Sequence, residues 1–284
     1  MAQTGSSQKD ATTGESVVLI DKYEDDKIWK ITMNRPHRMN SIGSGLSQAL
    51  GNAFFDFVHS PTARVSVLTG AGERAFCAGA DLKETADRRQ AEARGETVAP
   101  PDPGSRSMVP LAEGLRCWKP TIAAINGFAI AGGFMYGMQC DIRLAVETAR
   151  IGIAEARWNM PGAGSAIAPT VTRQIALGHA LELILWGDTQ WSAQRAYDAG
   201  WVNQVYPTQE ALQEGAMEWA NRSLDMAPRA VRNDKQALYR GFGMSPDMGA
   251  AYGSALEQNL QGMKDSVEGP SAFAEKRRPN FLDA

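Results

Sequence analysis

The sequence predicts an α/β protein, and two observations support this fold class. Short apolar runs that suit buried strands alternate with segments of helical periodicity as far as residue 206, and from Thr208 onward the pattern is helical. The 284 residues are 43% hydrophobic and 21% charged, which is ordinary for a globular protein with a sizeable core. We therefore divide the chain into a disordered polar tail (residues 1–15), an α/β core (residues 16–206) and a C-terminal helical region (residues 207–284).

The core is expected to open with a β-hairpin, because two apolar runs at residues 17–20 and 28–33 flank a charged turn. A helix follows at residues 44–58, where Leu46, Leu50 and Phe54 share one face. Further strands are expected at residues 65–69, 121–125, 142–146 and 202–206, and further core helices at residues 108–118, 133–140, 179–186 and 192–199. The C-terminal region predicts helices at residues 208–225, 228–239, 247–263 and 266–276.

Charge and cysteine content limit the classes of partner and compartment. The net charge of −3 gives no general attraction to nucleic acid or to an anionic membrane, so we expect neither as a partner. Cys77, Cys117 and Cys140 have no metal or disulfide spacing and are expected to be buried, reduced thiols. The polar first residues do not resemble a signal peptide, and no apolar stretch reaches the roughly 20 residues of a membrane span. These features predict a cytoplasmic protein without a bound metal.

Two segments rich in small residues are the most informative part of the sequence. Each follows a strand, and small residues there let the backbone come close to a ligand. Two such segments can each direct a backbone N–H at one point and so form an oxyanion hole; the alternative is a plain strand-to-helix turn. The segments are Ala75-Phe76-Cys77-Ala78-Gly79-Ala80-Asp81-Leu82-Lys83 and Ile125-Asn126-Gly127-Phe128-Ala129-Ile130-Ala131-Gly132-Gly133.

These segments occur in order with four other motifs along nearly the whole chain. The others are Asn34-Arg35-Pro36, Lys119-Pro120-Thr121, Cys140-Asp141-Ile142-Arg143 and Phe273-Ala274-Glu275-Lys276-Arg277-Arg278-Pro279. Together the motifs resemble the enoyl-CoA hydratase/isomerase (crotonase) superfamily. The resemblance implies a spiral of stacked β-β-α units, an acyl-CoA thioester substrate with no separate cofactor, and a homotrimer or dimer of trimers formed through the C-terminal helices. It also implies that the backbone N–H groups of Ala80 and Gly132 hold the thioester carbonyl oxygen.

The acid–base residues depart from the family pattern. Hydratases of this superfamily typically use two glutamates, the first in a Gly-Gly-Gly-x-Glu pattern. Here the corresponding residues are Ala131-Gly132-Gly133-Phe134-Met135, and Met135 cannot accept a proton. The second glutamate matches Glu155, although the segment from Glu155 to Pro161 is one residue shorter than usual. Glu155 is therefore the one residue that we expect to act as a general acid or base; the alternative is a surface or ion-paired glutamate.

The resemblance also suggests where coenzyme A and the acyl group bind. Arg38 matches the position of a basic contact to the nucleotide, although it could equally be a solvated loop charge. Ala78, Asp81 and Leu82 correspond to residues beside the adenine pocket, chiefly through their backbone. Met135 and Trp158 are expected at the acyl group. Residues 87–104, charged and then proline-rich, are expected to be a loop or short helix followed by a link, acting as a substrate lid or as a plain solvated loop.

We therefore predict an enoyl-CoA hydratase-type lyase with an oxyanion hole and a single glutamate, acting on a bulky or aromatic unsaturated acyl-CoA. Two alternatives keep the glutamate at position 155, namely an enoyl-CoA isomerase and a hydroxycinnamoyl-CoA hydratase-lyase. The second of these normally carries Tyr and Phe where this chain has Thr85 and Ala86. An alternative of another class is a non-catalytic CoA-binding protein that has lost its acid–base pair.

Overall fold

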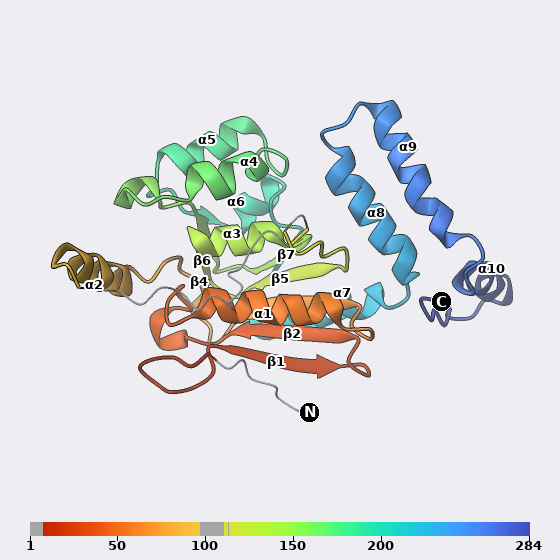
Figure 1. Cartoon of the computed structure of the whole chain (residues 1–284), viewed down its shortest axis with the longest axis horizontal. Helices are drawn as coiled ribbons and strands as arrows, with labels where there is room; N and C mark the ends of the chain where they lie inside the picture. Colours follow the sequence, from red (N-terminus) through yellow and green to blue (C-terminus); the bar gives the residue numbers. More distant parts are fainter. Residues whose placement is uncertain (1–7, 97–110, 113) are drawn as a thin grey trace.

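The computed structural model describes residues 8–96, 111–112 and 114–284, and it contains two β-sheets covered by helices (Figure 1). In this described part, the larger sheet has six strands in the order β1-β2-β3-β5-β7-β10 and the smaller has four in the order β4-β6-β8-β9. The strands of the larger sheet are β1 Val18–Tyr23, β2 Ile28–Met33, β3 Val65–Gly70, β5 Thr121–Ile125, β7 Ile142–Val146 and β10 Gln204–Tyr206. Those of the smaller sheet are β4 Ala75–Cys77, β6 Phe128–Ile130, β8 Arg150–Gly152 and β9 Trp191–Ser192.

The predicted hairpin is confirmed, because β1 and β2 pair antiparallel from Val18 opposite Met33 to Tyr23 opposite Ile28. The other neighbours in the larger sheet pair in parallel. All residues of β3 and β5 are buried, as expected for parallel strands covered on both faces.

Most of the predicted helices are present with shifted ends; α4 was not predicted, and α2 was expected only in part, as a loop or short helix from residue 87. The helices of the core are α1 Leu46–His59, α2 Leu82–Ala93, α3 Gly132–Gln139, α4 Ala168–Val171, α5 Leu177–Leu185 and α6 Ala193–Asp198. Those of the C-terminal region are α7 Gln209–Ser223, α8 Pro228–Gly241, α9 Pro246–Glu257 and α10 Asp265–Glu275. Helix α7 contacts β3, β5, β7 and β10, whereas α8 and α9 form a hairpin that stands beside the core (Figure 1).

From β3 to β8 consecutive strands alternate between the two sheets, and this alternation is the predicted spiral of β-β-α units. Strand β3 lies in the larger sheet and β4 in the smaller, then α2 follows; β5 and β6 repeat the step, and α3 follows them. Strands β7 and β8 divide between the sheets in the same way. Because β4, β6 and β8 are parallel neighbours, with Cys77 opposite Ala129 and Ile130 opposite Gly152, their carboxyl ends meet at one edge. The segments that leave this edge carry the predicted site residues.

Three expectations need correction or completion. The helix predicted over residues 108–118 is wrong where the structure describes it, because residues 111–112 form a turn and residues 114–118 are irregular. The strands of the smaller sheet were not predicted as such, since two or three residues are too few to show a period. Residues 87–93, expected to be a loop or short helix, belong to α2; the link expected after them, from residue 97, lies outside the described residues.

The disordered tail predicted over residues 1–15 is also wrong for its described part, residues 8–15. Lys9 pairs with Ser16 in an isolated bridge, and the side chain of Asp10 is fully buried. The composition of this segment suggested a solvated tail, but Asp10 satisfies a buried arginine, Arg35, and this ion pair orders the backbone around it. Residues 1–7 lie outside the described part.

Other expectations concern the thiols and the membrane. Cys77, Cys117 and Cys140 are buried and free, and burial raises the pKa of their thiols to about 12, 11 and 12. They are therefore inert core residues rather than nucleophiles. Within the described residues, no helix has the length and apolarity to cross a membrane.

Candidate active site

Two backbone N–H groups without partners in the secondary structure lie where β4 and β6 end. Ala80 forms a parallel bridge with Ile42. The N–H of Ile42 donates to the carbonyl of Gly79, and the N–H of Asp81 donates to the carbonyl of Ile42. The bridge therefore does not use the N–H of Ala80. Gly132 is the first residue of α3, and a first-turn N–H has no acceptor within its own helix. These are the two donors that the sequence predicts for the oxyanion hole.

Glycines allow these two segments to approach each other closely. Gly79 has φ of +91°, and a Cβ on it would lie 2.8 Å from the Cβ of Ala131 and 3.4 Å from the backbone nitrogen of Gly132. A Cβ on Gly133 would overlap the carbonyl oxygen of Cys77. Side chains at Gly79 and Gly133 would therefore separate the two donors. Ala131 stands where the family pattern has a glycine and takes a φ of +55°, a strained value for a residue with a side chain.

Glu155 lies on the segment that leaves β8, and its carboxyl group points into a nearly dry environment. The residue is 8% exposed, and its buried Oε2 atom has no hydrogen-bond partner among the described residues. Burial raises the pKa of this carboxyl, partly offset by the backbone N–H groups of Glu155 and Ala154. A raised pKa suits a group that must take up and return a proton near neutral pH.

A cavity of about 240 Å³ joins these groups. Its only titratable lining residue within the described part of the chain is Glu155, and the other lining side chains are apolar or absent. At its mouth Leu82 and Trp158 are 42% and 56% exposed, which places two large apolar side chains where a ligand enters. The lining residues are Ile42, Ala78, Ala80, Leu82, Ile130, Ala131, Gly132, Met135, Ala154, Glu155, Trp158, Met160, Pro161, Gly162 and Ile167.

A buried arginine holds the segment that carries the first donor. Arg35 is 1% exposed, and its guanidinium group donates to the carbonyl of Ser41 at 2.8 Å and to Glu84 at 2.7 Å. Its Nε donates to Asp10 at 2.6 Å. Residues 41–44, fixed in this way, form the bridge with Ala80, and the end of the Ile42 side chain reaches Gly132. The ion-pair network therefore supports both donors without touching the cavity.

The structure brings together all predicted site residues except Arg38 and Asp81. Asp81 accepts a hydrogen bond from the N–H of Glu84 as the N-cap of α2 and one from Ser41 Oγ, so its side chain is occupied within the fold. Arg38 lies half-buried in the short helix Pro36–Arg38 and does not line the cavity.

Sequence reasoning missed Ile42, Ile130, Met160 and Ile167, which form apolar walls of the cavity. Ile42, Met160 and Ile167 are isolated apolar residues outside any recognised motif, and Ile130, although it lies within the second small-residue segment, has no feature that marks it as a wall of the cavity.

This arrangement can polarise a carbonyl group and move a proton beside it. Two fixed N–H dipoles stabilise negative charge that develops on a carbonyl oxygen, and one such donor is worth about 3 kcal/mol. Glu155 is the group that can exchange a proton with a bound acyl chain. Within the described residues, no set of three or more His, Cys, Asp or Glu side chains is grouped to hold a metal.

The chain is similar in sequence and in fold to known proteins. Residues 24–284 match the family model described as enoyl-CoA hydratase/isomerase. The chain is 33% identical over 255 residues to (E)-benzylidenesuccinyl-CoA hydratase of Thauera aromatica, covering 89% of this chain and 95% of the relative. It is 35% identical over 257 residues to enoyl-CoA hydratase EchA19 of Mycobacterium tuberculosis, covering 88% and 91%. The crystal structure of enoyl-CoA hydratase from Bacillus anthracis superimposes with a TM-score of 0.81 at 33% identity, over 95% of this chain and all of that one.

Proposed function

The chain belongs to the enoyl-CoA hydratase/isomerase family, and we propose that it is a hydratase-type lyase that uses Glu155 alone for both proton transfers. The observation that carries the proposal is the cavity that Ala80, Gly132, Glu155 and Met135 line together. In the sequence, Met135 stands where the family pattern has its first glutamate. The thioester carbonyl oxygen of an α,β-unsaturated acyl-CoA accepts hydrogen bonds from the N–H groups of Ala80 and Gly132.

The reaction adds water across the double bond. The carboxylate of Glu155 takes a proton from water as the water oxygen bonds to the β-carbon, and the electron pair of the double bond moves toward the thioester to give an enolate. The two N–H donors stabilise this enolate. The carboxyl of Glu155 then returns the proton to the α-carbon, so one molecule of water has been added and Glu155 is again ionised. Because one group must be base and then acid, a pKa raised by burial favours the cycle.

We propose a bulky or aromatic acyl group as the substrate class. Ile130, Met135 and Ile167 give the cavity apolar walls, and the large apolar Trp158 stands at its mouth. A flat ring can be buried against such side chains without leaving a polar group unpaired. The relative from Thauera aromatica, whose name gives a benzylidene-substituted acyl-CoA as its substrate, supports the same class.

A second candidate activity is isomerisation of an enoyl-CoA, favoured by Met135. An isomerase moves a proton between two carbons of the acyl chain and adds no water, so it needs one carboxyl group. Glu155 would remove a proton from the α-carbon of a 3-enoyl-CoA and return it to the γ-carbon.

The test follows the absorbance of the conjugated enoyl thioester with purified full-length protein. Crotonyl-CoA, cinnamoyl-CoA and 4-hydroxycinnamoyl-CoA should lose absorbance as they are hydrated, with the aromatic substrates preferred. A 3-enoyl-CoA should gain absorbance if the protein is an isomerase. Glu155→Gln should lower either rate by at least about 100-fold. Glu147→Gln, which changes an exposed carboxyl at the end of β7, should leave the rate unchanged.

Each outcome has a definite meaning. If the 3-enoyl-CoA gains absorbance and none of the conjugated thioesters loses it, the isomerase is favoured. If a CoA thioester binds but is not converted, and Glu155→Gln binds it equally well, the protein is a non-catalytic CoA-binding protein. Cleavage of the 4-hydroxycinnamoyl substrate to an aldehyde identifies a hydratase-lyase.

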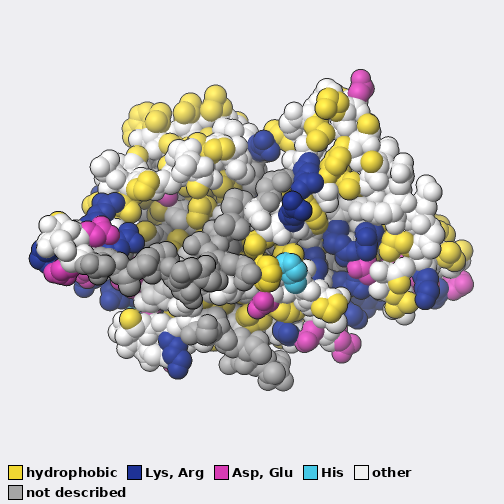
Figure 2. Space-filling model, in the orientation of Figure 1, with side chains coloured by type: hydrophobic (Ala, Val, Ile, Leu, Met, Phe, Trp, Pro, Cys, Tyr) yellow, Lys and Arg dark blue, Asp and Glu magenta, His cyan; other side chains and the backbone are white. Residues whose placement is uncertain are grey.

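We further propose that the chain assembles with itself, as a trimer or a dimer of trimers. Leu177, Leu181 and Leu185 form an exposed row along α5, and Leu238 on α8 and Phe242 directly after it are also exposed. Figure 2 shows apolar side chains gathered over these helices. Exposed apolar rows of this kind are typical of interfaces. Sedimentation equilibrium should give three or six times the chain mass of 30.7 kDa, and a monomer would refute the assembly.

A further inference from the structure

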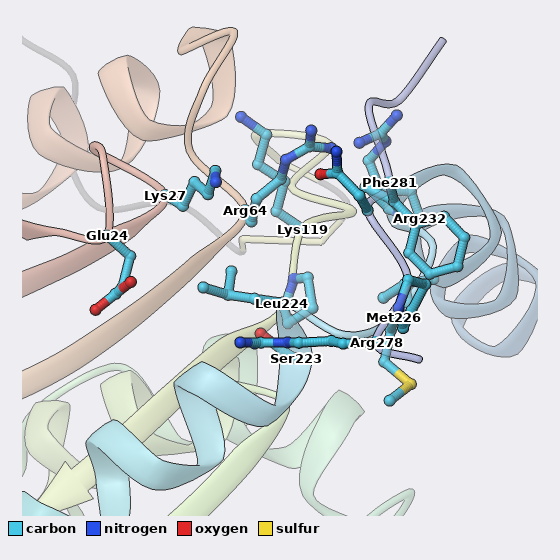
Figure 3. Close-up of a pocket in the computed structure, with 15 residues that line it drawn as sticks. Glu24, Lys27, Arg64, Lys119, Ser223, Leu224, Met226, Arg232, Arg278 and Phe281 are labelled. Atoms are coloured by element: carbon cyan, nitrogen blue, oxygen red, sulfur yellow. The ribbon is translucent and has the colours of Figure 1, made fainter. Parts of the chain in front are cut away.

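A second cavity, of about 250 Å³, lies between the larger sheet and the C-terminal helical region and shares no residue with the candidate active site. Lys27, Arg64 and Lys119 come from the turns that enter β2, β3 and β5. Arg232 comes from α8, and residues 278–281 from the segment after α10. Figure 3 shows these side chains around the cavity, with those from the sheet edge facing those from the helical region.

Positive charge dominates this second cavity. Among its described lining residues, five side chains are Lys or Arg and one, Glu24, is acidic. The protein as a whole carries a net charge of −3, so this concentration of cations is local. A low-dielectric recess lined by one sign of charge attracts ions of the opposite sign.

Part of this charge is satisfied within the fold. Arg278 pairs with Asp225, and Arg232 donates to Asp283 at 2.6 Å. The ammonium group of Lys119 donates to the carbonyl oxygens of Phe57 and Ser60 at 2.9 and 2.7 Å, at the end of α1.

In contrast to Arg278, Arg232 and Lys119, the side chains of Arg64 and Lys27 form no hydrogen bond within the described residues. The side chain of Arg64 is 16% exposed, and its buried Nη1 atom has no hydrogen-bond partner in the part of the chain that the structure describes. This Nη1 atom lies 3.4 Å from Oδ2 of Asp283, and the other oxygen of the same carboxylate, Oδ1, pairs with Arg232 and Arg229 at 2.6 and 3.6 Å. Lys27 is exposed and forms no ion pair within the described residues. One carboxylate therefore faces three guanidinium groups, and a buried donor of Arg64 has no hydrogen-bond acceptor among the described residues, which is unfavourable.

We propose that this cavity binds a phosphate group, as free phosphate or as the phosphate of a small phosphomonoester, with Arg64 and Lys27 as its principal ligands. A planar guanidinium group makes paired hydrogen bonds to phosphate oxygens, and a dianion neutralises both unmatched cations. The bound anion bridges the strand ends of the core to the segment at residues 278–281. It therefore stabilises the attachment of the helical region, and the site does not depend on the proposed enzymatic activity.

The test is calorimetric titration and thermal unfolding of the full-length protein with inorganic phosphate at constant ionic strength set by KCl. Saturable binding and a rise in unfolding temperature are expected. Arg64→Gln should weaken the affinity for phosphate at least about tenfold. Lys27→Gln should also weaken the affinity for phosphate, and because Lys27 is exposed this replacement should leave folding intact. Arg150→Gln, which removes an exposed charge on β8, should bind as the unaltered protein does.

Parallel titrations with glycerol 3-phosphate separate the two sources of the group. Tighter binding of glycerol 3-phosphate assigns the cavity to a phosphomonoester, and equal or tighter binding of phosphate assigns it to the free ion. A stabilisation that does not saturate, or equal binding by Arg64→Gln and Lys27→Gln and the unaltered protein, overturns the proposal.

Discussion

At the scale of single residues, the surroundings of Glu155 make its charge unfavourable to stability. Its carboxyl is buried, one of its oxygens has no hydrogen-bond partner within the described residues, and burial raises its pKa. In the unfolded chain the carboxyl ionises at its ordinary pKa, so folding is opposed wherever the pH exceeds that value. The residue that we propose for proton transfer therefore costs stability.

Replacement of Glu155 by Gln should stabilise the protein at neutral pH. The gain should be absent near pH 4, where the carboxyl is protonated in both states, and should grow as the pH rises through the raised pKa of the folded state. Unfolding temperatures of both proteins between pH 4 and 8 measure the difference. A gain that does not vary with pH would show that the carboxyl is not desolvated.

Position 133 leaves no room for a side chain, so only glycine fits there without moving the backbone. Gly133→Ala should destabilise the protein by about 2 kcal/mol and reduce activity at least about tenfold, because the new methyl group overlaps the Cys77 carbonyl and moves the start of α3. Gly164→Ala is the matched control, since a Cβ there meets no atom within 4 Å. Urea unfolding and the hydration rate test both; equal stability of the two variants would contradict the close approach.

At the scale of elements, residues 8–15 support the segment that carries Ala80, through the ion pair between Asp10 and Arg35. Burial raises the pKa of Asp10, but the hydrogen bond from Arg35 and those from the N–H groups of Thr12 and Thr13 outweigh it and lower the pKa to about 2. The stability from this ionised carboxyl is therefore present above about pH 4 and is lost as the pH falls toward 2.

Asp10→Asn should cost about 2 kcal/mol of unfolding free energy at pH 7, and the difference from the unaltered protein should disappear toward pH 2. Asp26→Asn removes a carboxylate whose ion pair with Lys22 is 3.6 Å long and exposed, so it should cost less than about 0.5 kcal/mol. Urea unfolding at several pH values provides the measurement. A pH-independent loss would mean that Asp10 does not act through its charge.

At the scale of the whole molecule, Lys235 joins helix α8 of the C-terminal region to the core. Lys235 on α8 donates to the Lys119 carbonyl at 2.8 Å and to Asp141 at 2.7 Å, and Tyr239 donates to the same carboxylate. Helices α8 and α9 stand beside the core rather than over it (Figure 1), and these bonds join α8 to the residues that precede β5 and β7.

Lys235→Met should loosen α8 and α9 while leaving the core intact. Breaking this buried pair should cost about 3 kcal/mol, expressed as faster amide exchange in α8 and α9 and little change in α1. Lys264→Met, at an exposed lysine before α10, is the control and should change neither. Uniformly faster exchange would show that the helices and the core unfold as one unit.

The sequence by itself determined the fold class, the order of the longer elements and the small-residue segments at Ala80 and Gly132, because hydrophobic periodicity and glycine spacing are local signals. It also pointed to Glu155 as the one carboxyl retained at a matching position. These features need no knowledge of distant contacts.

Only the tertiary structure decided how these parts meet. The strands of the smaller sheet are too short to be recognised, yet their parallel register brings the ends of β4, β6 and β8 to one edge. The ordering of residues 8–15 depends on a buried ion pair between Asp10 and Arg35, which are 25 positions apart. The phosphate-binding cavity that we propose joins residues from both ends of the chain. Burial and long-range pairing set these features, and neither is encoded in any one segment.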